Sequence, residues 1–132
     1  MTQSTGYESV VEDLRRLKLS TVRENLDAHL RLAQSKSPTY LEFLKGLTSE
    51  EIRGREESNY RRRLKSARFP ILKTLDEFDF ALQPSLSKDK IFQLKDCRWV
   101  ANAVNILFAG QSGTGKSHLA MSLGLEAIQM GY

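Results

Sequence analysis

The chain has 132 residues and a mass of 15.0 kDa, which is enough for one ordinary domain or two small ones. Hydrophobic residues make up 40% and charged residues 27%, a composition typical of globular proteins and unlike that of disordered chains. Its apolar stretches are far shorter than the roughly 18 residues that cross a bilayer, and nothing at its start has the pattern of a secretory signal. The single cysteine, Cys97, excludes an internal disulfide framework and a protein zinc site. We therefore expect a cytoplasmic protein that does not enter a membrane.

The net charge of +4 at pH 7 is unevenly distributed. Eight basic and two acidic residues lie between Arg53 and Lys73, so the rest of the chain is slightly acidic. A basic block of this kind is typical of a surface that contacts a polyanion or a partner, but a solvated helix face has the same composition. The candidate contact residues are Arg55, Arg61, Arg62, Arg63, Lys65 and Arg68.

Three capping-box patterns indicate helix starts in the first half of the chain. They begin at Thr21, Thr39 and Thr48, and each precedes apolar residues at spacings of three or four. We expect a helix after Thr21, a short helix after Thr39, and a longer, mostly polar helix from about Ser49 to Ala67. This region is therefore predicted to be all-α.

A connector with aromatic anchors is expected from Ile71 to Ser87, followed by a helix from about Ser87 to Val100. Core packing is favoured for Phe78, Phe80 and Trp99, and a pocket for an adenine base is the alternative. Structural roles are also favoured for His29 at the surface and for Cys97 as a buried or half-buried residue. For His118 a surface or packing role is favoured over catalysis.

The last part of the chain carries the clearest chemical motif. Residues 105–109 form a short apolar run with the length and composition of a buried strand. The following octapeptide, GQSGTGKS over 110–117, matches the P-loop pattern of glycine, four residues, glycine, lysine and then serine or threonine. Apolar residues at helical spacing continue to Gly131. Strand, glycine-rich loop and helix therefore occur in the order that a P-loop requires.

Each residue type in this loop has a chemical reason. Glycines let the backbone turn tightly and approach a phosphate without a Cβ in the way. Inward-pointing amides and the N-terminus of the following helix then attract an anion. Lys116 is placed to reach the β- and γ-phosphates of ATP, and the Ser117 hydroxyl to coordinate Mg²⁺. The predicted nucleotide-binding residues are Gly110, Gln111, Ser112, Gly113, Thr114, Gly115, Lys116 and Ser117. A glycine-rich turn that binds nothing is the structural alternative.

A longer set of residues resembles one family, the IstB-like transposition helper ATPases, which are similar to bacterial replicative-helicase loaders of the AAA+ class. The resemblance covers about residues 10–132 and rests on Arg62–Lys65, Ala67–Pro70, Lys73–Leu75, Phe78–Phe80, Gln83–Pro84, Gly113–Ala120 and Gly131–Tyr132. Gln111 stands where proline is common in the family, and Ser117 where threonine is common. Neither difference removes a binding group, because Gln111 contributes its backbone amide and Ser117 keeps the hydroxyl.

The resemblance implies an ATP-dependent helper, encoded beside a transposase in an insertion sequence, that assembles on DNA and recruits the transposase. It also implies that the arginine-rich helix contacts DNA or a neighbouring subunit, and that the full-length protein forms a homo-oligomer. A family member continues beyond this point with a Walker B acid, sensor residues and an arginine finger, and none of these follows Tyr132. We therefore expect a fragment that binds ATP weakly without turning it over.

The expected architecture is an α-helical N-terminal region followed by the first strand, P-loop and helix of an α/β P-loop domain of the AAA+ class. The sheet is expected to be incomplete, because one parallel strand has no ladder partner. The expected divisions are a helical domain over 1–75, a connector and helix over 76–104, and the start of the ATPase domain over 105–132. Two other readings stay open: a basic helical module for nucleic acid or a partner with a vestigial P-loop, and a helicase-loader-like ATPase. A small P-loop kinase is disfavoured, because the first half offers no acceptor site or lid.

Overall fold

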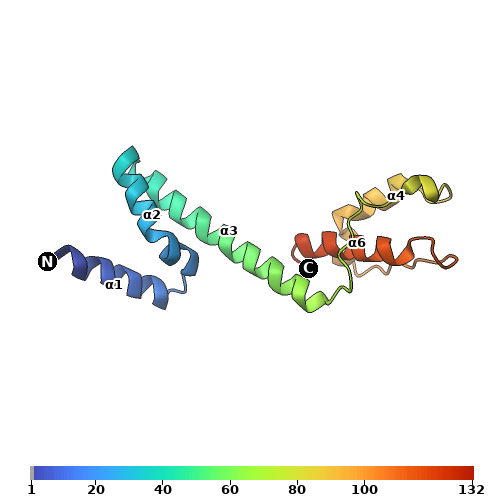
Figure 1. Ribbon diagram of the computed structural model, residues 1–132, viewed down its shortest axis with the longest axis horizontal. Helices are drawn as coiled ribbons and strands as arrows, with labels where there is room; N and C mark the ends of the chain where they lie inside the picture. Colours follow the sequence, from blue (N-terminus) through green and yellow to red (C-terminus); the bar gives the residue numbers. More distant parts are fainter. Residues whose placement is uncertain (1) are drawn as a thin grey trace. The chain divides into compact units, whose positions relative to one another are not determined.

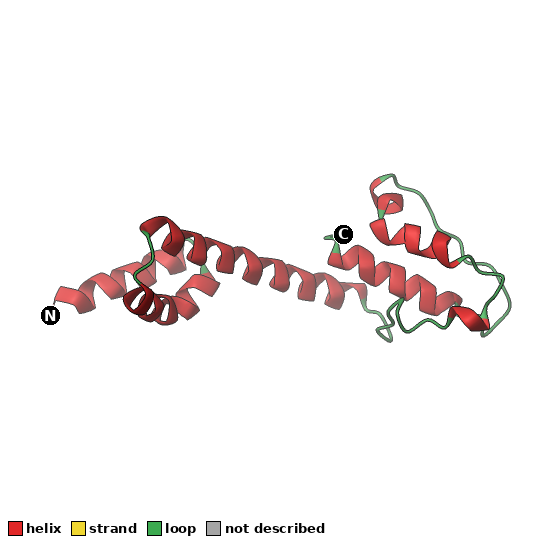
Figure 2. Ribbon diagram, turned by 90° about the horizontal axis from the view of Figure 1, so that it is seen from above, coloured by secondary structure: helices red, strands yellow, loops and turns green. Residues whose placement is uncertain are grey.

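The computed structural model describes residues 2–132, and within this range every regular element is helical (Figure 2). The elements in chain order are α1 Thr2–Arg16, α2 Ser20–Lys36, α3 Tyr40–Ala67, η1 Phe80–Leu82, α4 Lys88–Gln93, η2 Leu94–Asp96, α5 Arg98–Ala101 and α6 Lys116–Gln129 (Figure 1). The chain forms two compact units, Met1–Ser58 and Asn59–Tyr132. No helix in the described part combines the length and apolar character needed to cross a membrane.

Helix α1 precedes the first capping box in the sequence and carries no comparable signal. The hydroxyl of Tyr7 donates a hydrogen bond to the Asp27 carboxylate of α2 (O···O 2.8 Å). The buried residues of α2 are Val22 and Leu26, four residues apart on one helix face, as the apolar spacing predicted. The helix ends at Lys36, and its C-cap residue Ser37 donates its amide hydrogen to the Ala33 carbonyl and has a left-handed conformation (φ 43°).

The capping box predicted at Thr21 is wrong. Helix α2 begins one residue earlier, at Ser20, with Leu19 as its N-cap and no side-chain hydrogen bond from that residue. Thr21 instead packs against α3, where a Cβ added at Gly54 would overlap the Thr21 hydroxyl oxygen. The glycine therefore permits a close approach of the two helices.

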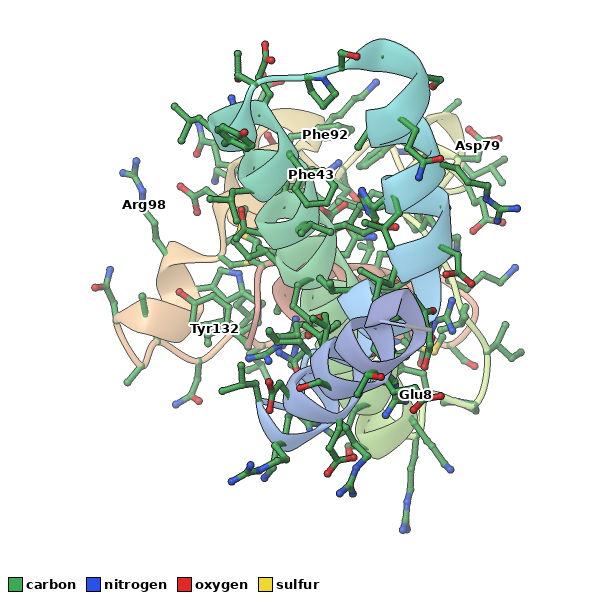
Figure 3. All side chains as sticks on the ribbon, turned by 90° about the vertical axis from the view of Figure 1, so that its left-hand side faces the viewer. Glu8, Phe43, Asp79, Phe92, Arg98 and Tyr132 are labelled. Atoms are coloured by element: carbon green, nitrogen blue, oxygen red, sulfur yellow. The ribbon has the colours of Figure 1, made fainter. Side chains whose placement is uncertain are left out.

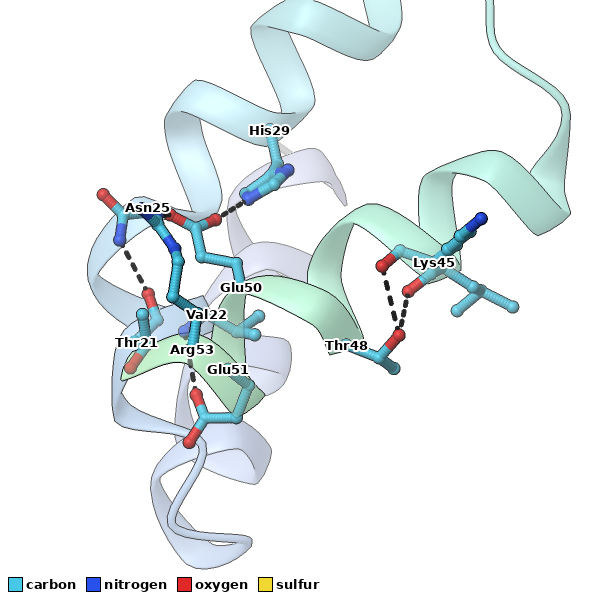
Figure 4. A network of polar contacts seen from close by, with 10 residues as sticks. Thr21, Val22, Asn25, His29, Lys45, Thr48, Glu50, Glu51 and Arg53 are labelled. Atoms are coloured by element: carbon cyan, nitrogen blue, oxygen red, sulfur yellow. Dashed lines mark hydrogen bonds and ion pairs between the residues drawn. The ribbon is translucent and has the colours of Figure 1, made fainter. Parts of the chain in front are cut away.

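The cap of α2 comes from a glutamate on α3. The buried Glu51 carboxylate accepts the Val22 amide hydrogen (N···O 3.1 Å; Figure 4). It also accepts a hydrogen bond from the Arg55 guanidinium (2.9 Å). Arg55 also donates to the Lys18 carbonyl (3.0 Å). A carboxylate at this position satisfies a free amide and complements the positive end of the helix dipole. One side chain therefore joins the start of α2 to the middle of α3.

A second polar contact joins the same helices. His29 is half-buried and forms a hydrogen bond through Nε2 with the Glu50 carboxylate (Figure 4). The prediction of a plain surface histidine is therefore wrong, because a glutamate 21 residues away faces it.

The capping box predicted at Thr39 is confirmed. The Thr39 amide donates to the Glu42 carboxylate (2.8 Å), and the Glu42 amide donates to the Thr39 hydroxyl (3.2 Å). These reciprocal bonds satisfy free amides of the first turn of α3. The hydrogen bonds from Thr39 also lower the pKa of the Glu42 carboxyl.

The third capping box is wrong, because α3 continues without interruption from Tyr40 to Ala67. The Thr48 hydroxyl donates to the carbonyls of Leu44 (3.0 Å) and Lys45 (3.2 Å) in the preceding turn (Figure 4). A threonine that bonds back in this way fits a helix interior and caps nothing. The predicted helix end at Ala67 is confirmed.

The unit Asn59–Tyr132 has its core around α6. The buried residues of this helix are Leu119, Ser122, Leu123, Leu125, Ala127 and Ile128. Leu119 and Leu123 form a cluster with Leu75, Phe78 and Ile91. Burial of each such side chain stabilises the unit by about 1.5–3 kcal/mol before the entropic costs of folding.

The other end of α6 is held by residues around the end of α3. Arg63 donates a hydrogen bond to the Ile128 carbonyl (3.2 Å) in the last turn of α6. A basic group at a helix C-terminus complements the free carbonyls there. Phe69 lies against Gly124, where an added Cβ would be 2.7 Å from the ring.

The helix predicted from Ser87 to Val100 is present only in pieces. Ser87 is the N-cap of α4, and its hydroxyl accepts the Lys90 amide hydrogen (3.4 Å). Cys97 then adopts a left-handed conformation (φ 54°) that separates η2 from α5. The cysteine is fully buried, in agreement with its prediction as a small buried residue, and burial raises the pKa of its thiol. Arg98 extends outward from α5 (Figure 3).

The strand predicted over 105–109 is not formed within residues 2–132. Ile106 and Phe108 pack against the core, whereas Leu107 between them is 90% exposed. This alternation is that of a half-buried strand, but a strand also needs the ladder hydrogen bonds of a neighbour, and the described chain supplies none. The expected fold class is therefore realised as the helical region, the loop and the helix, without the strand.

Replacing Glu51 with alanine is expected to lower the free energy of unfolding by about 1–3 kcal/mol, because the Val22 amide and the Arg55 guanidinium lose a buried acceptor. Glu56→Ala, at an exposed position of the same helix, is the matched control. Urea unfolding of the two variants tests this, and equal stability of both would contradict the capping role of Glu51.

The contribution of Glu51 is also expected to depend on pH. Burial acts to raise the pKa of its carboxyl, but the hydrogen bonds from Arg55 and Val22 outweigh it and hold the pKa below its ordinary value. The stabilisation is therefore complete above the unfolded pKa of about 4.3 and is lost as the pH falls through the folded pKa. Thermal unfolding measured from pH 7 to pH 3 should show that the difference in Tm between the unmodified chain and Glu51→Gln becomes smaller in acid. A difference in Tm that stays constant with pH would rule out this linkage.

Candidate functional site

The predicted P-loop is an exposed turn that leads into α6. Gly113 and Gly115 have positive φ angles of 78° and 87°, in the left-handed region that favours glycine. Gly115 is the N-cap residue of α6, so the loop passes directly into the helix. Of the predicted binding residues, Gly110 to Gly113 and Ser117 are exposed, and Thr114 to Lys116 are half-buried.

The N-terminus of α6 presents free hydrogen-bond donors. The Leu119 amide donates to the Gly115 carbonyl (3.0 Å), which is the first backbone bond of the helix. The amides of Lys116, Ser117 and His118 precede that bond and have no partner inside the helix. The N-cap residue Gly115 has no side chain that could accept a hydrogen bond from these amides. This helix end therefore offers amides and partial positive charge to an anion.

Two side chains of the loop converge on one backbone oxygen. The Thr114 hydroxyl donates to the Gln111 carbonyl (2.8 Å), and the Lys116 ammonium donates to the same oxygen. The structure thus brings Gln111, Thr114 and Lys116 together. The charged Lys116 side chain is therefore hydrogen-bonded to the backbone of its own loop.

A cleft of about 430 Å³ adjoins the loop, within the size range of small-molecule sites. Its lining residues are Gln83, Ser85, Leu86, Leu107, Phe108, Ala109, Gly110, Gln111, Thr114, Lys116 and Leu119. Three of these lining residues, Gln83, Ser85 and Leu86, are not among the predicted site residues. They match no chemical motif, and only the tertiary fold brings them to the loop.

The loop also rests on residues that the sequence placed in the connector. Phe78 is buried in the core, as its predicted packing role required, and its ring lies against Gly115. The Nε2 atom of His118 lies 2.8 Å from the Thr74 carbonyl oxygen. His118 therefore has the packing role predicted as one of its two alternatives.

The predicted basic contact residues have different surroundings. Arg55 belongs to the first unit and binds Glu51, whereas the others belong to the second. Arg63 is half-buried and donates a hydrogen bond to the Ile128 carbonyl. Arg62 is exposed and donates to the side-chain oxygen of Asn59 (2.6 Å). An open hollow of about 360 Å³ is lined by Arg61, Leu64, Lys65, Arg68, Phe69 and Leu72. Basic and apolar side chains therefore share one surface after the middle of α3.

The loop sequence, its two left-handed glycines and the uncapped helix behind it define the chain as a P-loop protein. Residues 12–132 match the family described as IstB-like ATP binding protein. The chain belongs to this family.

Curated relatives agree with the family match. The chain is 38% identical over 125 residues to a protein named as an IS21-like insertion-sequence ATP-binding protein of Bacteroides fragilis, covering 95% of this chain and 48% of the relative. It is 35% identical over 119 residues to an IS21 counterpart of Pseudomonas aeruginosa, covering 90% and 45%. It is 37% identical over 125 residues to an IS5376 counterpart of Geobacillus stearothermophilus, covering 95% and 50%. The chain thus spans about half the length of these relatives.

The two left-handed glycines should differ in their tolerance of alanine. At Gly113 an added Cβ meets nothing within 4 Å, so Gly113→Ala should cost only the conformational penalty of about 1–2 kcal/mol. At Gly115 the same atom would lie 2.5 Å from the Phe78 ring, so Gly115→Ala should be clearly the more destabilising change. Thermal unfolding of both variants measures the difference. Equal losses would show that Phe78 does not press on Gly115.

Proposed function

We propose that this chain is the ATP-binding part of an insertion-sequence helper protein and that residues 110–117 bind the triphosphate of ATP. The observation that carries the proposal is the GQSGTGKS loop at the uncapped N-terminus of α6. Family membership supports ATP as the nucleotide, because the matched family and the named relatives are described as ATP-binding.

The residues present fit a triphosphate. The free amides of α6 supply donors, and the left-handed glycines let the backbone approach without a Cβ. Lys116 would exchange the Gln111 carbonyl for phosphate oxygens, which accept a stronger, charge-assisted bond. The adjoining cleft leaves room beside the loop for the rest of the nucleotide.

Magnesium fits the same site through one protein oxygen. The exposed Ser117 hydroxyl would hold Mg²⁺, as the P-loop pattern predicts, and the described residues contain no cluster of three His, Cys, Asp or Glu side chains for a metal elsewhere. When bound, Mg²⁺ neutralises charge on the β- and γ-phosphates. No acidic side chain is among the residues that line the cleft, so no carboxylate there positions an attacking water. We therefore propose that this chain binds ATP without turning it over.

We further propose that the helper acts on DNA together with the transposase of its insertion sequence, as a homo-oligomer when full-length. The names of the relatives support the insertion-sequence setting. The surface lined by Arg61, Lys65 and Arg68 supports the DNA contact, because clustered basic residues attract phosphates. The second candidate function is that of a basic helical module that binds nucleic acid or a partner, with a vestigial P-loop. The surface lined by Arg61, Lys65 and Arg68 supports this candidate too.

Titration calorimetry with Mg-ATP tests the nucleotide proposal. Lys116→Ala should weaken binding by roughly tenfold or more, because a charge-assisted bond to phosphate is lost. Lys88→Ala, which removes a lysine of α4 from outside the cleft lining, should leave the affinity unchanged. No heat of association with the unmodified chain would overturn the proposal. Steady-state ATP hydrolysis that Lys116→Ala abolishes would contradict binding without turnover.

Salt titration of DNA binding tests the basic surface. Lys65→Ala and Arg68→Ala should each weaken binding to any sequence and reduce the slope of log K against log salt by about one. Arg98→Ala, at an exposed site on α5, is the control for net charge. If the salt slopes of Lys65→Ala and Arg68→Ala equal that of Arg98→Ala, this surface is not the DNA contact. DNA binding without any Mg-ATP binding would instead favour the helical module.

A further inference from the structure

Residues 74–80, called the brace below, contact the first turn of α6 at two points. The Phe78 ring occupies the space beside Gly115, so that an added Cβ there would lie 2.5 Å from Cε2. The ring of His118 reaches the Thr74 carbonyl, with Nε2 and the oxygen 2.8 Å apart. Gly115 directly precedes Lys116 and Ser117, and His118 directly follows them. The brace therefore holds the helix turn on both sides of these two residues.

The two contacts are joined through aromatic rings. Phe78 is 9% exposed and meets His118 edge-on, with ring centroids 5.2 Å apart and planes at 84°. On its other side it meets Phe80 at 4.8 Å and 67°. Edge-to-face rings at these distances attract each other beyond simple burial. The same ring therefore packs on the glycine and orients the histidine.

The brace is an ordered turn. The amide and the hydroxyl of Thr74 both donate to the Glu77 carboxylate (2.8 and 3.0 Å), and the Phe78 amide donates to the Leu75 carbonyl (3.1 Å). Leu75 is 2% exposed in the core beside Leu119. An element held by its own hydrogen bonds and by a buried leucine can resist displacement of the helix end.

Phosphate binding by backbone amides depends on the exact direction of those amides, since preorganised donors are effective only at hydrogen-bond distance. The orientation of the amides at 116 and 117 follows the left-handed turn at Gly115 and the first turn of α6. We propose that Phe78 and His118 are positioning residues of the phosphate site, which hold this turn in its binding geometry. The inference rests on the proposed nucleotide binding and adds to it a requirement for the brace.

The role of His118 is a donor role. The Thr74 carbonyl can only accept, so Nε2 carries the hydrogen, and both the neutral Nε2–H tautomer and the imidazolium supply it. His118→Gln retains an N–H donor on a side chain of similar reach. His118→Leu keeps an apolar body of similar size and removes the donor. Phe78→Leu keeps the site apolar and removes the ring that packs on Gly115.

The test is titration calorimetry with Mg-ATP and, separately, with inorganic triphosphate as a probe of the phosphate site alone. His118→Leu and Phe78→Leu should each weaken both ligands by roughly five- to tenfold, and His118→Gln should restore most of the loss. Phe43→Leu, which removes a half-buried aromatic ring of α3 in the unit Met1–Ser58, is the control and should bind as the unmodified chain does. Equal weakening of both ligands places the effect at the phosphates.

Amide hydrogen exchange separates positioning from unfolding. In His118→Leu the amide of Leu119, which makes the first backbone bond of α6 to the Gly115 carbonyl, should exchange faster, while that of Leu123 in the middle of α6 keeps its protection. If the unmodified chain binds and both leucine variants bind equally well, the brace has no positioning role. Failure of His118→Gln to restore binding would overturn the donor role of the histidine. If the unmodified chain binds neither ligand, the proposed function itself fails.

Discussion

The burial of α6 against Leu75, Phe78 and Ile91 is the interaction on which the unit Asn59–Tyr132 depends. It removes apolar side chains of the helix from water, which is the main favourable term in forming the unit. The same packing holds the N-terminus of α6 at a glycine loop, with its first amides unpaired and pointing out of the helix. The core and the candidate phosphate site therefore share one helix, and Leu119 in its first turn belongs to both the core and the lining of the cleft.

Signals that act within a few residues could be predicted from the sequence. Thr39 and Glu42 form their capping box, and the P-loop pattern leads into a helix that starts at Lys116. Similar patterns failed where a distant residue supplied a better partner. Glu51 caps α2 from 29 residues away, and Thr48 lies inside a longer helix, bonded to its own preceding turn. Local propensity sets what a segment can do, and tertiary contacts then select among those states.

Two further features could not be predicted from the sequence, each for a physical reason of its own. The run 105–109 has the alternation of a strand, but a strand is a property of a pair, and the described chain offers no second member. A count of charges likewise does not tell which ones are available. Arg55 and Arg63 belong to the basic block by sequence, yet each serves a contact within its own unit. The exposed basic residues become recognisable only when the hollow beside Leu64 and Phe69 is seen.

The whole functional proposal depends on whether the loop 110–117 binds a triphosphate, and ¹⁵N NMR spectra recorded with increasing Mg-ATP answer that question residue by residue. We expect the amide resonances of Gly113, Gly115, Lys116 and Ser117 to shift together and saturate at one affinity, because these amides would donate to the phosphates. Saturable shifts confined to other parts of the chain, or no shifts at millimolar nucleotide, would contradict it.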